Sequence, residues 1–273
     1  MPFATKDMLI SGTGHFMQFA DLRGKVAIVT GASRLGGIGA ATCRAFAAQG
    51  CSVFFTIYPK YDAVAFPSKS TAMDSEQIAA ELRNMGVAAA FMEVDMAQPD
   101  CAKQILDTVE FLLGIPTILV NNAAHSAKDG FETLDAAGLD LHYAVNVRGA
   151  ALLSVEFARR CPNDSGGRII NLTSGQEREP MTGELAYAAT KGAISAFTRS
   201  LAKEVASKGI TVNAVDPGPT DTGWMSDQLK NQLIASNANR RLGLPEDAAR
   251  LIVFLASEAA RQLSGEVIHA RGI

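Results

Sequence analysis

The sequence lacks the features that mark membrane proteins, secreted proteins and nucleic-acid-binding proteins. No apolar run approaches the ~20 residues that a helix needs to cross a bilayer. The first 25 residues, MPFATKDMLISGTGHFMQFADLRGK, have no basic segment followed by a continuous apolar run, so they do not resemble a secretory signal. A net charge of −3 gives no reason to expect nucleic acid or an acidic membrane surface as a partner. We therefore expect a soluble cytoplasmic protein.

Cysteine and histidine are too scarce and too scattered to suggest a metal site or a disulfide framework. The chain has four of each, and no CxxC pair or zinc-like cluster occurs. Such cysteines are typical of buried free thiols in a reducing compartment. They are Cys43, Cys51, Cys101 and Cys161.

Apolar residues are abundant and fall into short runs that alternate with helical patterns. They make up 48% of 273 residues, which suits one large α/β domain. Continuous runs rich in β-branched residues are typical of strands buried on both faces of a parallel sheet. The expected strands are 25–30, 51–56, 88–94, 117–120, 168–173, 211–215 and 266–270. The expected helices are 38–49, 75–85, 99–113, 133–160, 184–207 and 245–257.

This alternation predicts an α/β fold, a single Rossmann-type doubly wound domain with a seven-stranded parallel sheet flanked by helices. The domain is expected to span residues 21–273, after an N-terminal tail of residues 1–20. Residues 57–74 and 216–244 do not fit the alternation and are predicted to be long loops. Loops at the carboxyl ends of parallel strands are where this architecture places its ligands.

A glycine-rich turn, TGASRLGGIGAA at 30–41, directly follows the first expected strand and opens a helix. In that context Gly31 permits a tight turn, while Gly37 and Gly39 let the backbone approach a pyrophosphate. The free N–H groups and the dipole at the helix start then bind the phosphates. The alternative is a turn whose glycines serve backbone geometry alone.

Charge at this turn bears on which nicotinamide nucleotide is used. NAD-selective sites usually carry an Asp or Glu about twenty residues after the glycines, to accept the ribose hydroxyls. Here the second strand ends at Thr56, no carboxylate follows before Asp62, and Arg34 lies inside the turn beside Ser33. A cation with no opposing acid favours a 2′-phosphate, so NADP(H) is predicted over NAD(H). A solvated loop charge at Arg34 is the alternative.

The stretch GELAYAATKGAIS, residues 183–195, places Tyr187 and Lys191 one helical turn apart on one face. A nearby ammonium stabilises a phenolate and lowers the pKa of the tyrosine, which makes it a better general acid or base. By spacing alone, a core tyrosine beside a surface lysine would be the favoured interpretation. Two further residues favour catalysis, because Ser174 lies just past a strand end and Asn146 is a polar residue in an otherwise apolar helical stretch.

Together these motifs, spanning about residues 24–270, resemble the short-chain dehydrogenase/reductase family. The resemblance implies that Tyr187 is the general acid/base and that Lys191 lowers its pKa and holds the nicotinamide ribose. It also implies that Ser174 positions the substrate carbonyl and that Asn146 holds a water that links Lys191 to solvent. The implied cofactor-binding residues are Gly31, Ser33, Arg34, Gly37, Ile38, Gly39, Thr56, Asp95, Asn121, Ala123, Tyr187, Lys191, Pro217, Gly218 and Thr220.

Three of these assignments rest on short matches within the family. Asp95 is similar to the residue that binds adenine, with an ordinary loop acid as the alternative. Asn121, in NNAA, resembles the first Asn of the family's N-N-A-G motif. Pro217-Gly218 resembles the segment that packs on the nicotinamide. His125 and His142 are interpreted as structural.

Within the family, GRIINLTS, AYAATKGAI and GITVNAVDPGPTDT are most similar to 3-oxoacyl-[acyl-carrier-protein] reductases. The implied function is NADPH-dependent reduction of a ketone to a secondary alcohol, with a 3-oxoacyl thioester as one candidate substrate. The alternatives are an NAD(P)-dependent dehydrogenase of a secondary alcohol, polyol or sugar, and a non-catalytic dinucleotide sensor. Specificity is expected in 176–184 and 221–240, where Trp224, Met225 and Leu229 could form an apolar lid.

The expected partners are a small-molecule carbonyl or acyl thioester and further copies of this chain, with the long helices at 133–160 and 184–207 forming the contacts. The resemblance implies a tetramer, but the chain stops at ARGI without the usual Gly-Gly turn, which makes a dimer the alternative. An acidic acyl carrier would need a basic patch. Arg148, Arg159 and Arg160 are its candidates, with a solvated helix face as the alternative reading.

Overall fold

The computed structural model describes residues 17–67, 71, 73–237 and 239–270, so most of the predicted N-terminal tail lies outside the described residues. Within them, seven strands form one sheet in the order β3-β2-β1-β4-β5-β6-β7, and every neighbouring pair is parallel. This confirms the predicted doubly wound sheet. The strands are β1 (Val26–Val29), β2 (Ser52–Ile57), β3 (Ala89–Glu93), β4 (Ile118–Asn121), β5 (Arg168–Leu172), β6 (Thr211–Asp216) and β7 (Val267–His269).

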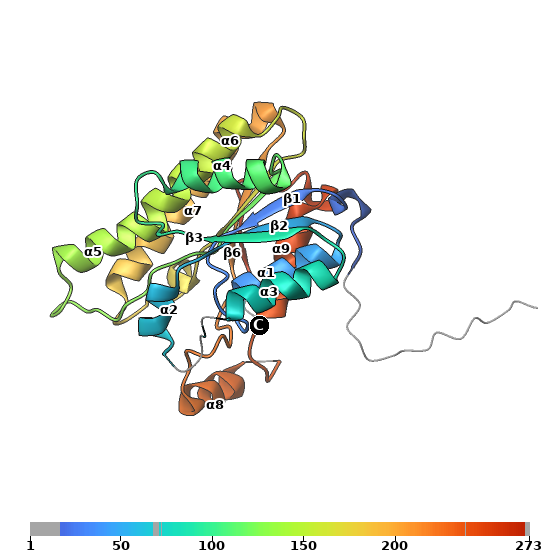
Figure 1. The fold of residues 1–273 in the computed structure, drawn as a ribbon. Helices are drawn as coiled ribbons and strands as arrows, with labels where there is room; N and C mark the ends of the chain where they lie inside the picture. The colour runs from blue at the N-terminus through green and yellow to red at the C-terminus, as the bar shows by residue number, and fades with distance from the viewer. Residues whose placement is uncertain (1–16, 68–70, 72, 238, 271–273) are drawn as a thin grey trace, which may run out of the picture.

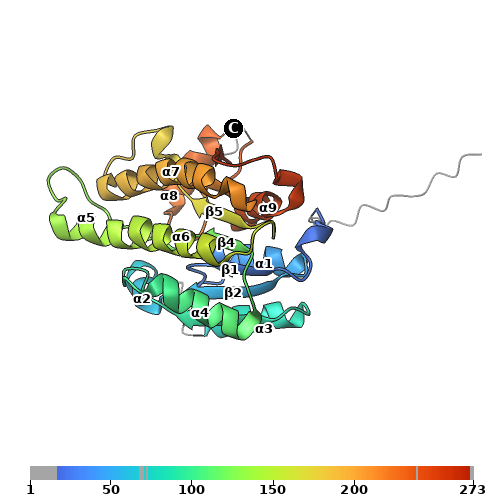
Figure 2. The same ribbon diagram turned by 90° about the horizontal axis from the view of Figure 1, so that it is seen from above.

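Helices cover both faces of the sheet (Figure 1). One face carries α1 (Ile38–Ala48), α3 (Asp74–Asn84) and α9 (Pro245–Ala256). The other carries α4 (Cys101–Leu113), α5 (Ala136–Tyr143), α6 (Ala150–Arg160) and α7 (Leu185–Val205), and Figure 2 shows α7 lying alongside α5 and α6. No helix in the described ranges is long and apolar enough to cross a membrane.

The two core layers explain why the strands read as continuous apolar runs. Along β1, Ala27 and Val29 pack into the layer under α1 and α9, whereas Val26 and Ile28 pack into the layer under α4 and α6. Alternate side chains of a strand point to opposite faces, so a sheet covered on both faces needs apolar residues at every position. All four cysteines lie in these described layers, buried and with free thiols.

Two predicted loops contain helices, and one predicted helix is divided. Residues 57–74 include α2 (Pro59–Ala65), whose Pro59 suits a first helical position. Residues 216–244 include α8 (Asp227–Ser236), which Ser226 caps by accepting a hydrogen bond from the Leu229 N–H at 3.2 Å. The predicted helix 133–160 comprises α5, a π-helical segment (Ala144–Gly149) and α6.

Candidate active site

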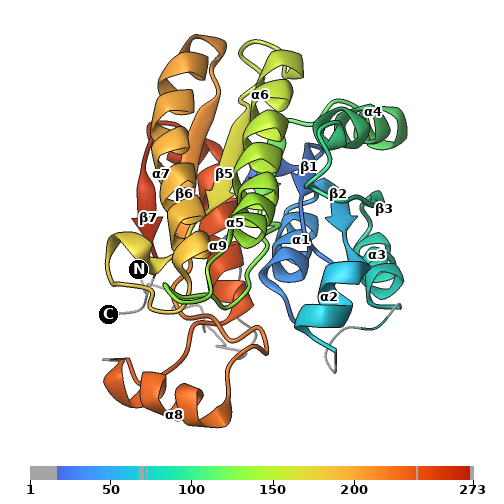
Figure 3. The ribbon, with the colours of Figure 1, turned by 90° about the vertical axis from the view of Figure 1, so that its left-hand side faces the viewer.

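A cavity of about 930 Å³ lies at the carboxyl ends of the strands and is bordered by α2 and α8. Figure 3 shows these two helices at the end of the sheet toward which the strand arrows point. The cavity wall combines residues that follow β1, β2, β3, β4, β5 and β6. The topology therefore brings together side chains from the whole length of the chain, at the place expected for a ligand in this fold.

The glycine turn forms one end of this cavity through close backbone contacts. Gly31 has a φ of +71°, and a Cβ there would lie 2.7 Å from the Cα of Ala123. A Cβ on Gly39 would lie 2.6 Å from the carbonyl oxygen of Gly31. Gly37, and not Gly36, lines the cavity and immediately precedes α1. Ile38 and Gly39 also line the cavity, at the helix start where N–H groups lack intrahelical acceptors.

Thr56 and the loop after β4 hold this turn in place. The Oγ1 atom of Thr56 accepts a hydrogen bond from the N–H of Gly31 at 3.1 Å. The side-chain amide of Asn122 donates to the carbonyl oxygens of Thr30 and Gly31, both at 2.8 Å. Thr56, Asn122 and Ala123 line the cavity.

Asn121, predicted to bind the cofactor, does not line the cavity. It is buried in β4, and its Nδ2 donates to Ser154 Oγ and Asn171 Oδ1, both at 2.8 Å. Successive residues at a strand end point in different directions, so the cavity is reached by Asn122 instead. We correct the prediction accordingly. The NNAA motif locates the loop but does not show which asparagine faces the ligand.

Arg34 has a carboxylate partner that the sequence argument did not foresee. Its Nε lies 3.3 Å from Oδ1 of Asp62, and both side chains are largely buried. Asp62 belongs to α2, which returns to the glycine turn although it lies 28 positions further along the chain. The premise that no acid opposes Arg34 is therefore wrong. Ser33, Arg34 and Asp62 all line the cavity.

Asp95 lies just beyond β3 on the cavity wall, as expected of a residue near the adenine end. Its Oδ1 accepts from the N–H of Ala97 at 2.8 Å, and its Oδ2 accepts from the Tyr58 hydroxyl at 3.3 Å. These contacts fix the carboxylate on the cavity wall, and its role toward the adenine stays a prediction.

Ser174 and Tyr187 meet on the cavity wall, joined by a hydrogen bond between their side chains. Burial raises the pKa of Tyr187 above its usual range, and the bond with Ser174 offsets this only in part. Lys191 was expected to lower that pKa. Instead its Nζ donates to the carbonyl oxygen of Leu172 at 2.7 Å and lies 5.4 Å from the centroid of the Tyr187 ring. Burial is the largest influence on the pKa of Tyr187, and its lowering by Lys191 stays a prediction.

Lys191 is itself perturbed by its surroundings. It is buried within the helix-to-sheet contact, and burial lowers its pKa to about 8. Lys191 lies behind the cavity lining and not on it.

Asn146 lies in the π-helical segment and is 2% exposed. Its Oδ1 accepts from the N–H of His125 at 2.7 Å, and its Nδ2 donates to His125 O at 2.9 Å and to Thr190 Oγ1 at 3.0 Å. Asn146 therefore ties the loop after β4 to α7, which carries Tyr187 and Lys191.

The His125 side chain reaches the cavity lining, whereas His142 is buried and accepts from Ala127 N at 3.2 Å.

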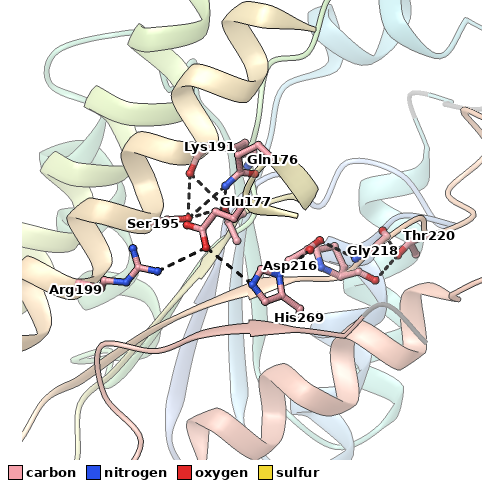
Figure 4. Close-up of polar contacts among 11 residues, drawn as sticks. Gln176, Glu177, Lys191, Ser195, Arg199, Asp216, Gly218, Thr220 and His269 are labelled. Atoms are coloured by element: carbon pink, nitrogen blue, oxygen red, sulfur yellow. Dashed lines mark hydrogen bonds and ion pairs between the residues drawn. The ribbon is translucent and has the colours of Figure 1, made fainter. Parts of the chain in front are cut away.

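The loop after β6 supplies Pro217, Gly218 and Thr220 to the cavity wall. Asp216 holds this loop, because its Oδ1 accepts from the Gly218 N–H at 2.9 Å. Its Oδ2 lies 3.0 Å from Nδ1 of His269 at the end of β7 (Figure 4). The other ring nitrogen of His269 lies 3.9 Å from Oε2 of Glu177, just after Ser174. His269 thus lies between the residues that end β6 and the segment that follows β5, which the sequence did not indicate.

The expected apolar lid is present in part. Trp224 and Leu229 line the cavity, with Leu233 beside them on α8. The indole N–H of Trp224 donates to Thr220 O at 3.1 Å. Met225 is buried and lies outside the lining. Tyr61 of α2 also lines the cavity, and its hydroxyl accepts from Ser126 N at 3.2 Å.

Comparison with known proteins agrees with this architecture. A family model described as enoyl-(acyl carrier protein) reductase matches residues 31–272. An oxidoreductase of Bacillus subtilis named YjdA is 50% identical, over 91% of this chain and 96% of its own length. An NADPH-dependent aldehyde reductase-like protein of Arabidopsis thaliana is 32% identical, over 92% of this chain and 94% of its own length. The 3-oxoacyl-[acyl-carrier-protein] reductase FabG of Aquifex aeolicus is 31% identical, over 92% of this chain and 97% of its own length.

Solved structures give the same assignment. A short-chain dehydrogenase/reductase of Serratia marcescens is 33% identical, with a TM-score of 0.82 over 92% of this chain and 98% of that one. A Burkholderia cenocepacia short-chain dehydrogenase in complex with NADP is 31% identical, with the same score and coverage. Fold, family model and relatives agree, and the chain belongs to the short-chain dehydrogenase/reductase family of oxidoreductases, enzymes that bind a nicotinamide dinucleotide and act on CH–OH and C=O groups.

Proposed function

We propose that this enzyme reduces the carbonyl group of a small ketone to a secondary alcohol. The pair formed by Ser174 and Tyr187 on the cavity wall is the observation that carries the proposal. Two hydroxyls from different elements converge there, so one carbonyl oxygen can receive a hydrogen bond from each. A tyrosine hydroxyl carries its proton at neutral pH and can donate it to that oxygen.

The glycine turn and the strand ends fit a nicotinamide dinucleotide. Gly31 packs against Ala123 and Gly39 against Gly31, which leaves no room for a side chain at either glycine, and the start of α1, where phosphates bind, borders the cavity. Asp95 would lie toward the adenine, and Pro217, Gly218 and Thr220 toward the nicotinamide. When bound, the reduced nicotinamide would supply the hydride.

Residues of the chain then supply the proton that the carbonyl oxygen receives. Ser174 orients the carbonyl oxygen, and Tyr187 donates its hydroxyl proton to that oxygen. Lys191, one turn away, has its Nζ held by the carbonyl oxygen of Leu172 and supplies a positive charge near the ring of Tyr187. Asn146 keeps α7 fixed against the loop after β4, so these groups hold their spacing.

NADPH is the proposed nucleotide, with NADH as a second one that the site accepts. Arg34 lies at the glycine turn, where a 2′-phosphate would need a cation. The related Burkholderia protein was solved with NADP, and the Arabidopsis relative is named as NADPH-dependent, which supports the same choice. Asp62 opposes Arg34 and limits this preference.

A free carbonyl compound is a better candidate substrate than one attached to an acyl carrier protein. The arginines that were candidates for an acidic partner are already engaged. Arg160 pairs with Asp107, Glu110 and Glu156, and Arg159 pairs with Glu156. Arg148 donates to the carbonyl oxygen of Ala97. Trp224, Leu229 and Met181 give the substrate end of the cavity an apolar character.

An assay of reduced nicotinamide consumption tests the proposal. The panel should contain diketones, aldehydes, sugars and acetoacetyl thioesters, each with NADPH and with NADH. We expect turnover of an uncharged ketone. Turnover confined to the reverse assay, with secondary alcohols, polyols or sugars and the oxidised nucleotide, would instead favour a dehydrogenase.

A further inference from the structure

Arg34 is held on several sides by residues that the glycine motif does not include. Besides the 3.3 Å contact with Asp62, its Nη1 donates to the carbonyl oxygen of Thr222 at 2.8 Å. The central carbon of its guanidinium lies 3.6 Å from the centroid of the Phe66 ring. The Arg34 side chain is 15% exposed, so its guanidinium is held in one position before any nucleotide binds.

The charges around Arg34 do not favour a phosphate as strongly as the arginine alone would. Asp62 and Asp74 are both buried near this guanidinium, so two carboxylates surround one cation. Asp74 is engaged by the N–H of Leu35 and the hydroxyl of Thr71. Asp62 is different, because it lines the cavity and has Arg34 and the Ser33 hydroxyl as its partners.

The two natural nicotinamide nucleotides differ at one position of the adenosine ribose. A 2′-hydroxyl can donate a hydrogen bond to a carboxylate, whereas a 2′-phosphate is repelled by it. A phosphate that binds beside Arg34 must also compete with Asp62 for the same guanidinium. Because both side chains are shielded from water, this competition is stronger than it would be on the surface.

We propose that Asp62 is the residue that sets the nucleotide selectivity of this enzyme, by accepting the ribose hydroxyls of NADH and by opposing the 2′-phosphate of NADPH at Arg34. This inference rests on the proposed function, since it concerns the nucleotide of that same site. It assigns to α2 a role usually associated with the end of the second strand, where this chain has Thr56. The pair Arg34–Asp62 makes the wild-type site tolerant of both nucleotides.

Titration of the full-length protein with NADPH and with NADH, followed by nucleotide fluorescence, tests the inference without requiring a substrate. In Asp62→Asn we expect the ratio of the two dissociation constants to shift about tenfold or more toward NADPH, equivalent to about 1.4 kcal/mol. In Arg34→Gln we expect the ratio to shift toward NADH. Competition by 2′-phosphorylated AMP against AMP should show the same two shifts, which isolates the ribose position.

Glu81→Gln is the matched control. It removes one negative charge from an ion pair with Arg44, outside the cavity, and should leave the ratio unchanged. Asp62→Ser serves as a second variant if Asp62→Asn loses its thermal transition. A ratio that changes less than about twofold in both Asp62 variants would overturn the inference and leave the proposed function standing. Failure of the wild-type protein to bind either nucleotide would refute both.

Discussion

At the Tyr187 hydroxyl, two physical effects on acidity oppose each other. Burial disfavours the phenolate, and the hydrogen bond with Ser174 favours it, with burial the larger. The net result is a phenol that keeps its proton at neutral pH. A protonated phenol is the form that can donate to a carbonyl oxygen.

Replacing Tyr187 by Phe should remove the proton donor and leave the nucleotide site intact. We expect kcat for ketone reduction to fall by about 10²–10⁴-fold, because general acid catalysis typically contributes that much. The dissociation constant for NADPH should change little. Tyr143→Phe is the control, since Tyr143 is 52% exposed on α5 and lies outside the cavity lining. Near-normal turnover in Tyr187→Phe would disprove the assigned role.

Lys191 should make the stability of the fold depend on pH in the alkaline range. The unfolded chain keeps its Lys191 proton up to about pH 10.5, whereas the folded chain loses it near pH 8. The cost of burying this ammonium is therefore complete below pH 8 and is relieved as the pH rises toward 10.5. Across that window the stability of wild type relative to Lys191→Met should rise by about 3 kcal/mol at most. Urea unfolding of both proteins at matched pH values measures this difference, and a flat difference would contradict it.

The elements that shape the cavity are partly those that the sequence left unassigned. The helices α2 and α8 both border the cavity at the carboxyl end of the sheet (Figure 3), and each lies in a segment that lacks a long apolar repeat. Short helices with few apolar contacts give a weak periodic signal. Their positions depend on caps and on contacts across the cavity, such as Asp62 with Arg34 and Tyr61 with Ser126.

The loop after β6 should depend on Asp216 for its shape. In Asp216→Ala the N–H of Gly218 and the ring of His269 both lose a partner, so we expect the dissociation constant for nucleotide to rise about tenfold. Asp216→Asn keeps an oxygen that can accept from the Gly218 N–H, so this substitution should change the dissociation constant much less. Fluorescence titration of both variants, with thermal melts to verify folding, provides the measurement. Equal effects of the two substitutions would count against this positioning role.

At the scale of the whole molecule, the exposed apolar side chains of α5, α6 and α7 remain to be explained. Leu139 on α5, Leu152 on α6 and Leu185 at the start of α7 are each at least 41% exposed. These helices lie side by side on one face of the sheet (Figure 2). Such a surface supports the proposal that copies of this chain associate.

We expect the purified protein to sediment as a dimer or tetramer. The double substitution Leu139→Glu with Leu185→Glu should shift it toward the monomer, since charges would have to be desolvated at the interface. Far-UV circular dichroism would show whether the variant remains folded. The matched control is Phe111→Glu, at an exposed apolar position on α4. A monomeric wild-type protein at micromolar concentration would refute the association.

The sequence by itself determined the alternation of strands and helices, the glycine turn, and the Ser174, Tyr187 and Lys191 set. These features are local: burial on two faces imposes continuous apolar runs, and a phosphate-binding turn needs glycines at fixed positions. Only the tertiary structure decided that Asn122 and not Asn121 faces the cavity, that Asp62 opposes Arg34, and that the Nζ of Lys191 donates to the carbonyl oxygen of Leu172. Each of these depends on which side chains from distant segments share a site and how far they are removed from water. A linear pattern does not contain that information.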